Sequence, residues 1–110
     1  MRAIFINVTK REISEVVLDD TIILKELQRY VGGYIERALE LPNGDDLFVD
    51  EEGLLKSPEY FFMHEAGHQP FAGNGIIVGH DKEGETIAAR STLVDVIGKV
   101  DFMLAKRGAK

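Results

Sequence analysis

Apolar and polar residues alternate along the chain in a pattern that predicts several strand pairs. Residues 2–8 are apolar and β-branched and predict a central strand, and residues 12–18 predict a second strand paired with it as a hairpin. Residues 34–41 alternate between the two classes, and a proline–asparagine–glycine turn leads into a returning strand at 47–49. Further strands are predicted at residues 60–64, 76–79, 85–89 and 100–104.

Two segments have apolar residues at helical spacing. Residues 23–31 carry an apolar stripe, with Asp20 placed as the N-terminal cap and a glycine pair at 32–33 as the end. Ser91 is expected to cap a short C-terminal helix that Gly98 ends. The elements predict an α+β fold: a single, mostly antiparallel or mixed sheet with the main helix packed on one face and the short helix near the C-terminus.

Composition places the chain among single-domain globular proteins, so residues 1–110 are expected to form one domain. Apolar residues make up 45% of the chain and cysteine is absent, which excludes a disulfide framework and a thiolate metal site. Residues 50–53 are expected to form an acidic turn, and the Ser57-Pro58 pair predicts one helical turn at most before the next strand. The basic tail at 106–110 is expected to fray.

The formal net charge of −6 disfavours direct binding of nucleic acid, which needs a basic face to displace counterions. No apolar run is long enough to span a membrane, and the N-terminus becomes polar too soon for a secretory signal. Together with the lack of cysteine, these features favour a cytoplasmic location. The acidic cluster at residues 45–52 is expected to form a solvated hairpin edge that resists aggregation, with a mimic of nucleic-acid charge as the alternative.

A literal His-Glu-x-x-His string begins at His64 and ends at His68. In a zinc hydrolase the two histidines bind the metal from one face of a helix, and Glu65 would act as the general base. Here a glycine lies inside the string and Pro70 follows it, while aromatic residues precede it, so the context predicts a strand end entering a loop. A metal site would need His80 as its third ligand. We therefore predict no metal and keep a metal-dependent hydrolase as an alternative.

The glycine-rich loop that follows is the predicted ligand-binding site. Glycines let a backbone approach a ligand and expose its N–H groups, and Pro70 stiffens the loop and so lowers the entropy cost of binding. Histidine and glutamine side chains supply directional hydrogen bonds, and an aromatic ring can stack on a base or fill a partner's pocket. The predicted binding residues are His68, Gln69, Phe71, Gly73, Asn74 and Gly75.

Four stretches of the chain resemble a small, functionally uncharacterised domain family encoded in phage, plasmid and related mobile-element genes of bacteria. They are the opening residues 1–6, the Leu-Phe-Val-Asp-Glu-Glu-Gly-Leu-Leu-Lys stretch at 47–56, the Gln-Pro-Phe-Ala-Gly-Asn-Gly stretch at 69–75 running into 77–79, and the closing segment 92–104. The family carries no His-Glu-x-x-His string and no established catalytic residues, so the resemblance implies a genomic setting and a cytoplasmic location but no reaction.

From this setting we expect a non-catalytic binding protein without a cofactor. Its partner would be a host protein or a small nucleotide-like signal, and its role would be counter-defence. A structural or scaffolding subunit is the third alternative. A homodimer or larger assembly is expected because a single sheet leaves one face to cover, and because the aromatic residues Tyr60, Phe61, Phe62 and Phe71 exceed the needs of a small core.

Overall fold

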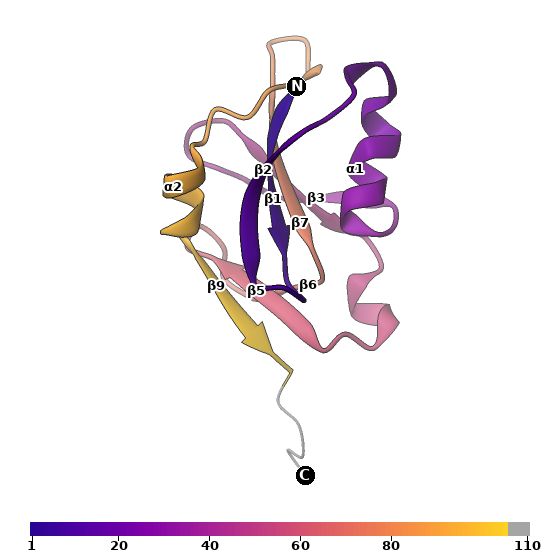
Figure 1. Cartoon of the computed structure of the whole chain (residues 1–110), viewed down its shortest axis with the longest axis vertical. Helices are drawn as coiled ribbons and strands as arrows, with labels where there is room; N and C mark the ends of the chain where they lie inside the picture. Colours follow the sequence, from indigo (N-terminus) through magenta and orange to yellow (C-terminus); the bar gives the residue numbers. More distant parts are fainter. Residues whose placement is uncertain (106–110) are drawn as a thin grey trace.

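The computed structural model describes residues 1–105, which form two antiparallel sheets, one main helix and one short helix (Figure 1). In the main sheet the strand order is β2-β1-β7-β4-β3, with β8 added to the end of β7. Its strands are β1 (Arg2–Asn7), β2 (Glu12–Val17), β3 (Ile35–Glu40), β4 (Asp46–Asp50), β7 (Gly75–His80) and β8 (Thr86–Ile87). The second sheet has the order β6-β5-β9, formed by β6 (Phe71–Ala72), β5 (Tyr60–His64) and β9 (Val100–Leu104).

The α+β class and the antiparallel pairing agree with the prediction, but the single sheet was wrong. The aromatic strand β5 pairs with β9 along its whole length instead of extending the main sheet. Because successive side chains of a strand point to opposite faces, Phe62 points inward and is fully buried while Phe61 lies on the outer face of the second sheet. The second sheet therefore covers the face that a single sheet would have left open.

Two hydrophobic cores lie on opposite faces of the main sheet. Helix α1 (Ile23–Val31) packs on one face, where Leu27 and Val31 meet Ile76 and Val78 of β7. The second sheet and α2 (Leu93–Ile97) close the other core, whose members are Ile4, Ile6, Val8, Leu41, Leu47, Val49, Phe62, Ile77, Ala89, Val96 and Val100. Strand β7 contributes to both cores because neighbouring residues face opposite sides. This explains its almost unbroken apolar sequence.

The N-terminal caps of both helical segments lie one residue away from their expected positions. A short 3₁₀ turn, η1 (Asp20–Ile22), precedes α1, and Asp19 caps it by accepting the amide of Thr21 at 3.0 Å. The C-terminal end agrees with the prediction, since Gly32 has a φ of 86° and its amide donates to the carbonyl of Gln28. Thr92, not Ser91, caps α2, because the Ser91 side chain is bound elsewhere.

A second 3₁₀ turn was also missed. It is η2 (Gly53–Lys56), which begins at the last residue of the expected acidic turn and ends just before Ser57, where a helical turn was expected to begin. Ser57 follows it with a φ of 52°, in the left-handed region, and so closes the turn. The predicted frayed tail lies outside the described residues. Within residues 1–105, no helix is both long and apolar enough to cross a membrane.

Candidate functional site

The His-Glu-x-x-His string starts at the last residue of β5 and continues as a turn, as its context predicted. The amide of Gly67 donates to the carbonyl of His64 at 2.8 Å, and the amide of Ala66 donates to His64 Nδ1 at 3.0 Å. The His64 side chain is buried, whereas His68 is exposed. The two imidazoles therefore do not share a helix face, which is the arrangement that a zinc hydrolase requires.

The third histidine has different surroundings. His80, at the end of β7, places Nδ1 2.8 Å from Oδ2 of Asp46 in β4.

Burial lowers the pKa of His64 below its usual value, the Lys99 ammonium lowers it further, and the Glu65 carboxylate opposes the shift. Among residues 1–105, no three His, Cys, Asp or Glu side chains are grouped so that they could hold a metal ion.

Several residues of the predicted binding loop are held by the fold. Asn74 Oδ1 accepts the amide of Val8 at 2.9 Å, so this side chain ties the loop to the end of β1. Gly75 is buried in β7, and a Cβ there would lie 2.7 Å from the Phe62 ring. The Phe71 ring packs on that same ring with 5.5 Å between centroids. In contrast, Gln69 is exposed and free to meet a partner.

A groove of about 220 Å³ lies between this loop, the β3–β4 pair and η2. We call it the loop groove. It is lined by Glu36, Arg37, Ala38, Val49, Asp50, Glu51, Gly53, Leu54, Leu55, Gln69, Pro70, Phe71 and Ala72. Of the predicted binding residues, Gln69 and Phe71 line it, while His68, Gly73, Asn74 and Gly75 do not.

The rim of the loop groove combines negative charge with exposed leucines. Glu36, Asp50 and Glu51 are acidic, and the guanidinium of Arg37 is drawn 3.3 Å from the Asp46 carboxylate. Leu54 and Leu55 are adjacent in η2, and 72% and 80% of their surfaces are exposed. Two large apolar side chains left in water side by side indicate a contact surface more strongly than scattered single ones do.

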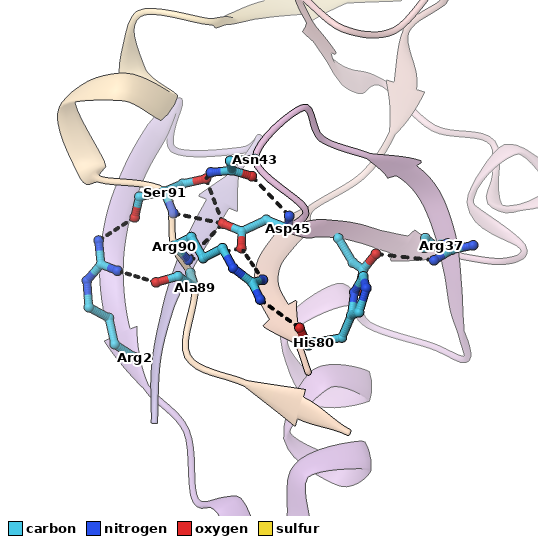
Figure 2. A network of polar contacts seen from close by, with 9 residues as sticks. Arg2, Arg37, Asn43, Asp45, His80, Ala89, Arg90 and Ser91 are labelled. Carbon is cyan, nitrogen blue, oxygen red and sulfur yellow. Dashed lines mark hydrogen bonds and ion pairs between the residues drawn. The ribbon is translucent and has the colours of Figure 1, made fainter. Parts of the chain in front are cut away.

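The acidic cluster before this groove is largely buried, contrary to the solvated edge that was expected. Asp45 is fully buried, and its carboxylate accepts the amides of Arg90 and Ser91 and the Ser91 hydroxyl, the last two at 2.7 Å (Figure 2). Arg2 donates to the carbonyls of Ala89 and Ser91 in the same segment. We call this the Asp45 network. It holds residues 89–91 against β1 and the 42–45 turn and leaves its carboxylate no access to a ligand.

Asp46, the next residue and the first of β4, has the side chains of Arg37 and His80 on its carboxylate. Its carboxylate is 3.3 Å from Arg37 NH1 and 2.8 Å from His80 Nδ1. These side chains border an open hollow of about 590 Å³, the His80 hollow, lined by Arg37, Asp46, Phe48, His80, Asp81, Lys82, Gly84 and Thr86. Sequence reasoning missed it because His80 was considered only as a metal ligand, and the pairing of β4 with β7 has no local signature.

The family model described as "Domain of unknown function (DUF3846)" matches residues 1–99, so the chain belongs to that family. This agrees with the expected resemblance to an uncharacterised domain family. Neither a curated protein nor a solved structure gave a significant match.

Proposed function

We propose that this member of the DUF3846 family is a non-catalytic binding protein whose loop groove takes a segment of a partner protein. The observation that carries the proposal is the exposed pair Leu54 and Leu55 beside the groove. Burying a leucine that is otherwise exposed contributes about 2 kcal/mol, so the pair supplies enough driving force for a peptide-sized contact.

The charge of the rim defines the partner. Glu36, Asp50 and Glu51 repel a phosphate, and the whole chain carries a formal charge of −6. Lys56 offsets Asp50 through a 2.6 Å ion pair, whereas Glu36 and Glu51 form no ion pair within residues 1–105. A host protein segment with an apolar anchor flanked by lysine or arginine complements this surface, and a nucleotide does not.

The genomic setting is part of the same proposal. Two of the four stretches that carry the resemblance to phage and plasmid proteins, 47–56 and 69–79, meet at the loop groove and supply most of its lining. We propose that the protein is encoded by a mobile element, acts in the bacterial cytoplasm, and serves counter-defence by occupying a surface of a host protein.

A peptide selection tests the groove. Random peptides are selected against the protein, and the enriched sequences are synthesised and measured by fluorescence anisotropy. We expect them to combine apolar residues with lysine or arginine and to bind Leu54→Ala/Leu55→Ala at least about tenfold more weakly. The matched control is Leu24→Ala, which removes an exposed leucine from α1.

The result that overturns the proposal is specific. Enriched peptides that are acidic, or that bind the double variant as tightly as the unaltered protein, would place the binding surface elsewhere. Both variants should keep their stability within about 0.5 kcal/mol, because the altered side chains are exposed. Loss of binding therefore cannot be ascribed to unfolding.

We also propose a homodimer, now through the edge of β9. The other long edges are protected: β3 has a bulge between Arg37 and Leu39, and β2 carries Glu12 and Glu15. Strand β9 has one charge, Asp101, and lies beside an apolar hollow of about 300 Å³ lined by Phe61, Pro70, Met103, Leu104 and Ala105. Two β9 strands pairing antiparallel about Phe102 set Asp101 opposite the partner's Met103, so no like charges meet.

A further inference from the structure

The His80 hollow differs from the loop groove in the groups that it offers. The Asp46 side chain is buried, and each of its carboxylate oxygens has a partner. Oδ1 contacts Arg37 and Oδ2 contacts His80. A carboxylate that accepts from Nδ1 fixes the orientation of the imidazole ring and leaves Nε2 as a hydrogen-bond acceptor. Within residues 1–105, Nε2 of His80 has no hydrogen-bond partner.

The remaining polar groups of the hollow are mostly donors. Arg37 donates to Asp46 through NH1, and its Nε and NH2 have no partner among residues 1–105. Lys82 and Thr86 make no side-chain hydrogen bond or ion pair within the described part of the chain. The one other carboxylate, Asp81, directs Oδ1 to the amides of Glu83 and Glu85. Unused donors around one hollow suit an anion.

An aromatic ring completes the hollow. Phe48 in β4 lies directly opposite Arg37 in β3, and paired residues of antiparallel strands point to the same face. Phe48 is only half-buried, so part of its ring borders the hollow. A flat group can stack on such a ring while an attached anion reaches the guanidinium.

We propose that the His80 hollow binds a small phosphorylated ligand with a flat ring, the chemistry of a mononucleotide. The phosphate contacts Arg37 and Lys82, and the ring lies against Phe48. A doubly charged phosphate with three acceptor oxygens matches these donors better than a carboxylate does. This second site shares only Arg37 with the loop groove and does not depend on a protein partner.

Calorimetric titration of the full chain with adenosine monophosphate tests the proposal, with inorganic phosphate and adenosine as partial probes. We expect the monophosphate to bind at least about tenfold more tightly than either part, because only it uses both the donors and the ring. Arg37→Met and Lys82→Met should each weaken it about tenfold. The matched control, Lys25→Met, alters an exposed lysine of α1 and should have no effect.

Several outcomes would overturn the proposal. One is the absence of a measurable heat with adenosine monophosphate up to about 1 mM at low salt. Another is unchanged affinity in both Arg37→Met and Lys82→Met. Equal weakening of adenosine monophosphate binding by Lys25→Met and Lys82→Met would point to diffuse charge instead of a site. Leu54→Ala/Leu55→Ala should bind the monophosphate normally, which separates this test from that of the loop groove.

Discussion

At the scale of single residues, His64 links folding to pH. Its pKa is lowered in the folded chain, chiefly by burial, whereas the unfolded chain takes up the proton near pH 6.5. Between those two pKa values the unfolded state binds more protons, so stability falls as the pH drops below about 6.5 and is unaffected by this group above it. Urea unfolding at about pH 7 and about pH 5 measures the loss.

The matched variant for this prediction is His64→Asn. The asparagine Oδ1 occupies the position of Nδ1 and still accepts the amide of Ala66, but the side chain no longer titrates. We expect the variant to lose less stability between about pH 7 and about pH 5 than the unaltered protein does. An equal loss in the two proteins would assign the pH dependence to carboxylates instead.

Residue identities predicted local geometry better than they predicted contacts. Pro70 and the aromatic run before His64 were sufficient to exclude a helix, because both effects act within a few bonds. Asn74 was taken for a binding residue, yet its side chain holds Val8, 66 residues away. Such a contact depends on which strands become neighbours, and nothing adjacent in the sequence encodes it.

At the scale of elements, the edge of β9 should set the oligomeric state. Met103→Glu places a carboxylate opposite Asp101 of the partner and should convert the dimer into a monomer in light scattering at micromolar concentration. Val17→Glu adds the same charge at an exposed position of β2 and should leave the dimer intact. A monomeric unaltered protein would exclude the dimer altogether.

Most strands and both helices were predictable, whereas η2 was not. The strands have apolar runs or alternation, and α1 has a stripe at helical spacing, so each carries its own periodicity. A four-residue 3₁₀ turn is too short to show a period, and its exposed leucines resemble a buried run. The element that supplies the exposed leucines of the proposed partner surface was therefore among those that the sequence did not predict.

At the scale of the whole molecule, the two sheets touch closely at Gly75. Its missing side chain admits the Phe62 ring and a Leu47 methyl group, at 2.7 Å and 3.0 Å from where a Cβ would lie. Gly75→Ala should cost about 1–3 kcal/mol of unfolding free energy in urea titrations, because the layers must separate. Gly98→Ala, where the nearest atom would be 3.6 Å away, should change it by less than about 0.5 kcal/mol.

The strand order also has a consequence for synthesis on the ribosome. Strand β1 lies between β2 and β7, so the first strand to be made shares its second edge with one made some 70 residues later. After β2 ends at Val17, about 60 residues must be made before β7 is complete. At about 5–20 residues per second, the β1–β2 hairpin therefore waits roughly 3–12 s with an apolar edge uncovered. During that interval the nascent chain can pair with a neighbouring chain on the same messenger. Slow translation should therefore lower the yield of folded protein, and a chaperone that shields strand edges should restore it.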